Sequence, residues 1–174
     1  MSSDAPQQRR KSTRLANHNY QEPGSYFITI CSHNKAATFS TIKENSLHLS
    51  IYGEVIEQCW QEIPEHFRNT RLDSFVIMPN HIHGVIHIDD WNTSKPIIAE
   101  SMSSLKPSSL GSIIASFKSA STKYIRKRVN DASVEIWQRN YYDRVIRNEK
   151  ELLQVRQYIE ANPLKWREDL LYLE

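Results

Sequence analysis

Hydrophobic and polar positions alternate along some stretches of this chain, as they do in strands whose two faces meet different surroundings. β-branched and aromatic residues are frequent in these stretches, which favours β-structure. The stretches that we predict as strands are 25–32, 46–50, 72–78 and 81–88. Pro79 and Asn80 separate the last two stretches, and the pattern leaves open whether these form one bent strand or two.

Other stretches repeat apolar residues every three or four positions, which is typical of amphipathic helices. Pro64 ends the first of these helices, Ser108 and Ser109 are candidate caps for the second, and Asn162 with Pro163 ends the third. The predicted helices are 55–63, 110–125 and 149–161.

The order of these elements is strand, strand, helix, strand, strand, helix, helix, without internal repeats. Such an order favours an antiparallel sheet backed by helices. We therefore predict an α+β, ferredoxin-like sandwich in which the strands at 72–78 and 81–88 are central.

The composition fits one globular domain. The chain has 174 residues, of which 39% are hydrophobic and 24% are charged. Residues 1–19 are polar and basic and are predicted to be a flexible arm, whereas residues 20–174 form the single domain. Residues 91–109 are rich in Ser and Pro and are predicted to be a long connection. No apolar run is long enough for a membrane span and no signal-peptide pattern is present, so we expect a cytoplasmic protein.

Basic residues concentrate in the second half of the chain. The net charge is only +2, but residues 115–150 contain nine Lys or Arg residues and four acidic ones. A solvated helical face and a nucleic-acid interface both fit this pattern.

Three histidines carry the chemistry that the sequence suggests. On a strand, His81, His83 and His87 share one face, and the isoleucines between them point into the core. Two imidazoles two residues apart can bind one divalent cation. Hydrogen-bonded histidines without a metal would give the same pattern, and His87 fits that alternative best.

The last predicted helix could supply further groups. Tyr158 and Asn162 are four residues apart and share a helical face, beside an apolar stripe that would pack on the sheet. By themselves, Tyr158 could be a packing residue and Asn162 a helix-end residue.

Together, these segments resemble the single-tyrosine HUH transposases, and within them the REP-associated tyrosine transposases. The similarity spans residues 20–166, and His81, Ile82 and His83 form the HUH motif of two histidines around a hydrophobic residue. The segments that carry it are FVIMPNHIHGVIHI, SLGSIIASFKS, WQRNYYDRVIRNEKEL and QYIEANPLKW.

This resemblance implies a function. His81 and His83 would bind Mg²⁺ or Mn²⁺, Tyr158 would be the nucleophile, and Asn162 would be the third ligand, a position where some relatives have Gln. The implied enzyme cuts and rejoins single-stranded or hairpin DNA through a 5′-phosphotyrosine, without a nucleotide cofactor. A homodimer with the HUH strand in a ferredoxin-like sheet is implied as well.

DNA would be bound by phosphate contacts from basic side chains and by stacking on aromatic ones. Trp137 could equally belong to the core, and the two tyrosines could cover a helix end. The basic candidates are Arg9, Arg10, Arg14, Lys118, Lys123, Arg126, Arg139, Arg144 and Arg147, and the aromatic candidates are Trp137, Tyr141 and Tyr142.

Two alternatives stay open from the sequence. One is a domesticated DNA-binding protein that keeps the fold and the hairpin affinity but no longer cuts. The other is a metal-dependent phosphoesterase that uses water, in which Tyr158 is structural.

Overall fold

The structure, a computed structural model, describes residues 23–44, 46–90 and 109–172. The predicted basic arm with Arg9, Arg10 and Arg14 lies outside these residues, as does nearly all of the predicted connection at 91–109.

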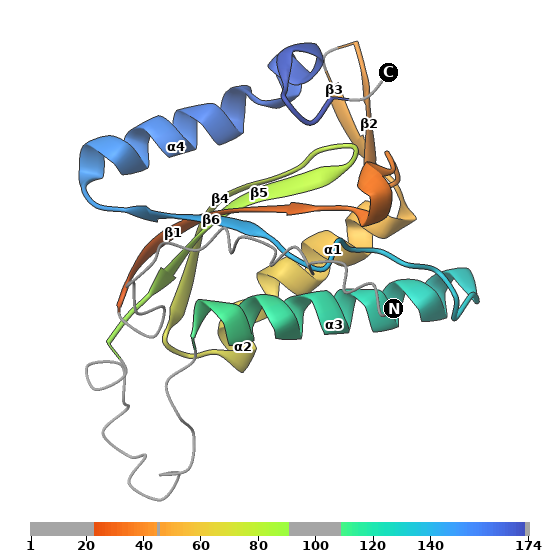
Figure 1. The fold of residues 1–174 in the computed structure, drawn as a ribbon, viewed down its shortest axis with the longest axis horizontal. Helices are drawn as coiled ribbons and strands as arrows, with labels where there is room; N and C mark the ends of the chain where they lie inside the picture. The colour runs from red at the N-terminus through yellow and green to blue at the C-terminus, as the bar shows by residue number, and fades with distance from the viewer. Residues whose placement is uncertain (1–22, 45, 91–108, 173–174) are drawn as a thin grey trace, which may run out of the picture.

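A four-stranded antiparallel sheet forms the centre of the protein, with the strand order β4-β5-β1-β6. One helical connection joins β1 to β4 and another joins β5 to β6, which is the ferredoxin-like arrangement (Figure 1). The predicted fold is therefore confirmed. The strands are β1 (Gly24–Cys31), β4 (Thr70–Ile77), β5 (His81–Ile88) and β6 (Tyr142–Ile146), and a separate hairpin contains β2 (Ser40–Lys43) and β3 (Ser46–Leu49).

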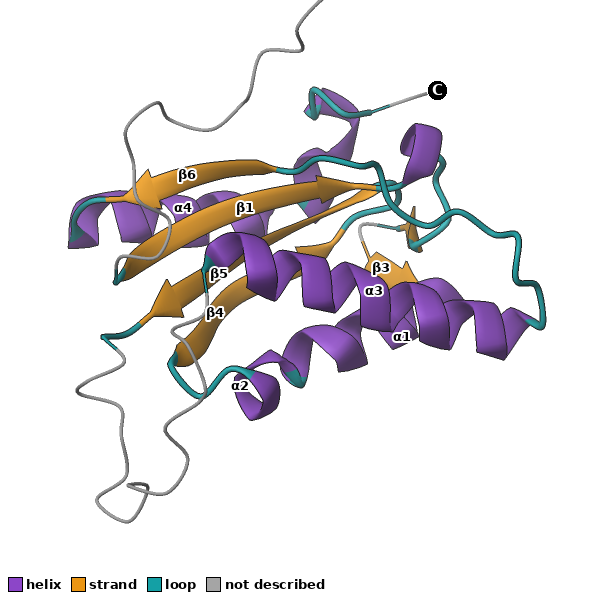
Figure 2. Cartoon of the chain, turned by 60° about the horizontal axis from the view of Figure 1, so that its bottom comes forward, coloured by secondary structure: helices purple, strands orange, loops and turns teal. Residues whose placement is uncertain are grey.

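The helices are divided unequally between the two faces of the sheet. Within the described residues, the first three helices along the chain lie on one face and the last helix lies on the other, as Figures 1 and 2 show. The first three are α1 (Ile51–Gln61), α2 (Ile63–His66) and α3 (Leu110–Val129), and the fourth is α4 (Glu149–Ala161); 3-10 turns are found at His33–Lys35 and Pro163–Glu168. No helix in the described ranges is long and apolar enough to cross a membrane.

The helix starts follow from side-chain caps. The Ser50 hydroxyl accepts hydrogen bonds from the backbone N–H groups of Tyr52 and Gly53, which starts α1 earlier than the apolar pattern indicated. Ser109 caps α3 in the same way, as predicted, and Asn148 caps α4. The predicted bounds of α4 are those of the structure.

The strand predictions need three corrections, the first of which is that β2 at Ser40–Lys43 was not predicted. Segments 72–78 and 81–88 are two strands of one antiparallel pair, and only β5 is central, because β4 lies at the edge of the sheet. The other edge strand, β6, was not predicted, since Tyr142 and Arg144 on it are exposed and only Ile146 is fully buried.

The main hydrophobic core fills the space between the sheet and helices α1 and α3. Trp60 of α1 stacks on Phe75 of β4, with ring centroids 4.4 Å apart. A β-carbon at Gly84 would lie 2.4 Å from the Trp60 ring, so only glycine lets α1 approach β5 this closely. This close packing fixes the distance between α1 and β5.

Candidate active site

All eight residues of β5 are buried, but its two faces differ in chemistry. Ile82, Ile86 and Ile88 belong to the main core under α1 and α3. His81, His83 and His87 lie on the opposite face, the one that α4 covers, together with the apolar Val85. The alternation predicted from the sequence is confirmed.

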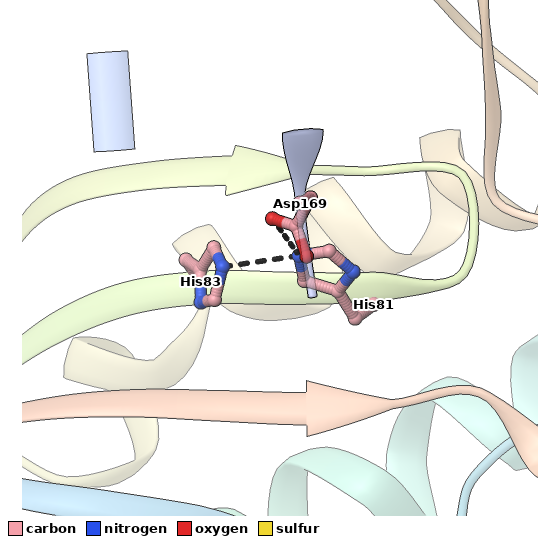
Figure 3. A group of neighbouring side chains, drawn as sticks. All are labelled: His81, His83 and Asp169. Carbon is pink, nitrogen blue, oxygen red and sulfur yellow. Dashed lines mark hydrogen bonds and ion pairs between the residues drawn. The ribbon is translucent and has the colours of Figure 1, made fainter. Parts of the chain in front are cut away.

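His81 and His83 point their Nε2 atoms at each other, 3.0 Å apart (Figure 3). The Nδ1 atom of His81 lies 2.9 Å from the Asn80 side-chain oxygen, and Nδ1 of His83 lies 2.8 Å from the Thr29 hydroxyl. Asn80 donates its amide to the Leu171 carbonyl, which identifies its oxygen as the atom facing His81. His81 therefore carries its proton on Nδ1 and presents the Nε2 lone pair to the site.

Asp169, which follows the last 3-10 turn, completes this group. One of its carboxylate oxygens lies 3.9 Å from His81 Nε2, and the side chain is 5% exposed. The carboxylate accepts hydrogen bonds from the Leu171 N–H and from the Asn162 amide at 3.1 Å. One ligand atom from each of His81, His83 and Asp169 lies within 4.8 Å of the others. The sequence reasoning did not find Asp169.

The donor set fits a divalent cation. Neighbouring ligands of an octahedral Mg²⁺ at 2.0–2.1 Å are about 3 Å apart, which matches the two Nε2 atoms. The two Nε2 atoms at this distance need either a shared proton or a cation between them, and the nearby carboxylate favours positive charge at this place. The Asn162 side-chain oxygen is buried without a hydrogen-bond partner and is a further oxygen donor beside the group. The predicted ligand Asn162 is thus at the site, next to Asp169.

Burial keeps both histidines neutral. It lowers the pKa of His81 to about 4, and burial together with the neighbouring His81 lowers the pKa of His83 to about 3. Metal binding requires neutral imidazoles, so the two side chains are ready to bind an ion at physiological pH.

Tyr158 lies on the face of α4 that meets this group. Its hydroxyl is 3.3 Å from His83 Nε2, its ring meets Phe27 edge to face, and 47% of the residue is exposed. Burial and Asp169 raise the pKa of Tyr158, and a hydrogen bond from Asn162 lowers it by less. The hydroxyl is therefore protonated at neutral pH, and a nearby cation would favour its ionised form.

Two hollows flank Tyr158 along the surface. One of about 400 Å³ lies between β6, β1 and α4, and one of about 520 Å³ lies between α4 and the segment that follows it. The first is lined by Phe27, Thr29, Tyr142, Arg144, Glu151 and Gln154, and the second by Ala161, Asn162, Lys165, Glu168, Asp169 and Leu170. A chain-like ligand can pass Tyr158 on both sides.

The predicted DNA-binding residues do not all gather at Tyr158. Arg144 lines the first hollow and Arg147 is exposed where β6 leads into α4. Another five line a groove of about 620 Å³ beside α3, which covers the opposite face of the sheet. These are Lys118, Lys123, Arg126, Arg139 and Trp137.

Some of these side chains already have partners in the protein. Lys118 donates to the backbone carbonyls of Gln138, Arg139 and Asn140, and burial lowers the pKa of its ammonium group to about 8. Trp137 donates a hydrogen bond to the Ser121 hydroxyl. Both Trp137 and Tyr141 pack against the main core. The structure favours the packing alternative for Trp137.

Comparison with known proteins places this geometry in context. No protein-family model matches the chain. An uncharacterized protein of Haemophilus influenzae is 40% identical over 171 residues, which cover 95% of this chain and 94% of that protein.

A solved structure of a REP-associated tyrosine transposase bound to a REP hairpin has a similar fold, with a TM-score of 0.59. The similarity covers 88% of this chain and 74% of the transposase at 15% sequence identity, so it shows a shared fold.

Proposed function

We propose that this chain, which belongs to one family with the uncharacterized Haemophilus influenzae protein, is a metal-dependent DNA transposase. Its fold is that of a REP-associated tyrosine transposase. It cuts and rejoins single-stranded, hairpin-forming DNA, with Tyr158 as the nucleophile. The observation that carries the proposal is the Tyr158 hydroxyl 3.3 Å from Nε2 of His83, whose neighbours His81 and Asp169 complete a metal-binding group.

His81, His83 and Asp169 would hold the divalent ion, Mg²⁺ or Mn²⁺, and the unpaired oxygen of Asn162 is placed to add a ligand. When bound, the ion supplies positive charge that stabilises the phosphate oxygens and the tyrosine phenolate. Asn80 and Thr29 orient the two imidazoles through their Nδ1 atoms.

In the cleavage step, the Tyr158 oxygen bonds to the phosphorus and the bond from phosphorus to the 3′-oxygen breaks. The tyrosine proton passes to water on the exposed side of the ring, and the released 3′-oxygen takes up a proton. The 5′-phosphotyrosine keeps the energy of the ester, so a 3′-hydroxyl can attack it and restore Tyr158. Cutting and joining therefore need one site and no ATP.

The two hollows beside Tyr158 suit an unpaired strand that continues on both sides of the scissile phosphate. Tyr142, which is 57% exposed, offers a stacking surface in one hollow, where Arg144 can meet a phosphate, and Lys165 offers a cation in the other. The groove beside α3 with Lys123, Arg126 and Arg139 would then contact the paired stem through its phosphates.

A covalent-adduct assay tests this function. Labelled hairpin DNA is incubated with the protein and Mg²⁺ or Mn²⁺ and analysed on a denaturing gel. The matched control for Tyr158→Phe is Tyr124→Phe, because Tyr124 is also 47% exposed but lies on α3. We expect a metal-dependent adduct with the unchanged protein and Tyr124→Phe, and none with Tyr158→Phe.

The other outcomes identify the rival functions. Hairpin binding without any adduct would indicate a non-cutting DNA-binding protein. Cleavage that survives in Tyr158→Phe would indicate a phosphoesterase that uses water.

A further inference from the structure

Strand β4, which pairs with the histidine strand β5, contains a β-bulge. Its register with β5 shifts between Leu72 and Phe75, so Asp73 and Ser74 together stand opposite Val85. Phe75 packs on Trp60 in the main core, and Val76 packs with Val85 under α4. Asp73 faces α4 by regular alternation from Leu72, and the extra residue of the bulge then directs Phe75 to the main core and Val76 to the α4 side.

Asp73 connects α4 to three strands. Arg156 of α4 donates two hydrogen bonds to its carboxylate, at 2.9 and 2.6 Å. His87 of β5 bonds to the same carboxylate through Nε2 at 3.0 Å, and its Nδ1 lies 2.6 Å from the Ser25 hydroxyl of β1. The side chain of Asp73 is 14% exposed and that of Arg156 is 44% exposed. The carboxylate is thus a fixed anchor, whereas the arginine approaches it from the surface.

Arg156 and Tyr158 lie on opposite flanks of the stripe that α4 buries. Counted from the buried Val155, Arg156 is about 100° around the helix in one direction and Tyr158 about 60° in the other. Arg156 accordingly reaches β4, and Tyr158 reaches Phe27 and His83. A roll of α4 by about 10° would move the Tyr158 hydroxyl by about 1.5 Å.

The apolar contacts of α4 are few and resist such a roll weakly. They comprise a small cluster around Val85, Leu152, Val155 and Ile159, with Phe27 and Val76 at its border. Apolar contacts are not directional, whereas a two-pronged bond between guanidinium and carboxylate fixes an orientation.

We infer that Asp73 is a positioning residue for the nucleophile: through Arg156 it fixes the roll of α4 and so holds the Tyr158 hydroxyl beside His83. The inference rests on the proposed function. The hydrogen bond from Arg156 holds the pKa of Asp73 well below its ordinary value, so the carboxylate is charged at neutral pH.

The test uses Arg156→Met, Asp73→Asn, the double variant and Arg156→Lys in the full chain. Lys150→Met is the matched control, because it removes an exposed positive charge from the same helix away from the sheet. The rate of adduct formation is measured at saturating hairpin DNA and Mn²⁺, beside the dissociation constants for both. In the free protein, an NMR cross-relaxation signal between the Tyr158 and Phe27 rings reports the position of the nucleophile.

Arg156→Met should slow adduct formation about 10- to 100-fold, the range expected for a displacement of about 1 Å, with both dissociation constants unchanged. The double variant should be no slower than Arg156→Met, Arg156→Lys should recover part of the rate, and Lys150→Met should behave like the unchanged protein. The Tyr158–Phe27 signal should weaken in Arg156→Met.

An unchanged rate and ring signal in Arg156→Met would overturn the inference, and so would a loss of DNA affinity as large as the loss of rate. If the unchanged protein forms no adduct, the proposed function fails, and the ring signal alone then decides whether Asp73 positions Tyr158.

Discussion

The two faces of the sheet differ in what they bury. The face toward α1 and α3 is packed almost wholly with apolar side chains, whereas the face toward α4 combines a small apolar cluster with buried histidines and carboxylates. One strand, β5, supplies both, with isoleucines on one side and histidines on the other. The difference indicates that stability comes mainly from the first face, whereas the candidate active site lies on the second.

This division also explains how a polar site can be buried at all. Desolvated polar groups cost free energy unless they have partners, and the α4 face supplies them for Asp73, His81 and His87. The densely packed opposite face fixes the backbone of β5 that carries these side chains.

Weakening the apolar face alone should lower stability without changing the site on the other face. Ile86 is fully buried there, and Ile86→Ala should lower the free energy of unfolding by about 2–5 kcal/mol, because it leaves a cavity. Urea unfolding measures this, and the rate of adduct formation per folded molecule should stay unchanged. A variant that keeps its stability but loses activity would contradict the division between the faces.

A second test concerns the polar face and its proposed metal ligands. Asp169→Asn keeps the shape of the side chain and the contact with the Leu171 N–H, but it removes the charge. We expect Mn²⁺ to bind about 10- to 100-fold more weakly in a calorimetric titration.

Asn162→Ala is the comparison variant, and we expect it to weaken Mn²⁺ binding by less. A larger loss in Asn162→Ala than in Asp169→Asn would restore the ligand set implied by the resemblance.

The smallest expected effect is the pH-dependent contribution of the Asp73 carboxylate to the free energy of unfolding. Its pKa is lowered in the folded protein, chiefly by Arg156, so its contribution to stability is present above the unfolded pKa of about 4 and is lost as the pH falls below it. Asp73→Asn should therefore lower the free energy of unfolding by about 1–2 kcal/mol at pH 7, after allowance for solvent screening.

Urea unfolding at pH 7 and pH 3 tests the direction of this pH dependence. The difference in free energy of unfolding between the unchanged protein and Asp73→Asn should be smaller at pH 3 than at pH 7. Glu160→Gln, an exposed change on the outer side of α4, should show no such trend. A difference that grows toward low pH would disprove the role assigned to the Asp73 charge.

The sequence predicted the elements whose pattern is strong. β5 and α4 carry clear periods of two and of three to four residues, which is why His81, His83, Tyr158 and Asn162 were placed on the right faces. Their assignment to one site came from the resemblance to HUH transposases, and the structure brings all four together. The ligand role of Asn162, the homodimer and the cytoplasmic location stay predictions.

What the sequence did not show depends on contacts between distant segments. Asp169 follows an irregular turn without a period, and only the folded chain brings it to His81. The bulge at Asp73 has no sequence signature that would place its carboxylate against Arg156. Lys118 belonged to a basic cluster in the sequence, but the carbonyls that it meets become visible only when the segment before β6 is placed beside α3.

The burial of the histidines would also govern how an ion enters and leaves the proposed site. His81 is 0% and His83 is 3% exposed, and the ring of Trp166 lies 5.9 Å from that of His81. Neither imidazole is open to solvent, so an ion bound there would exchange only with local movement of the residues around it. The lifetime of the bound state would then depend on that movement as much as on affinity.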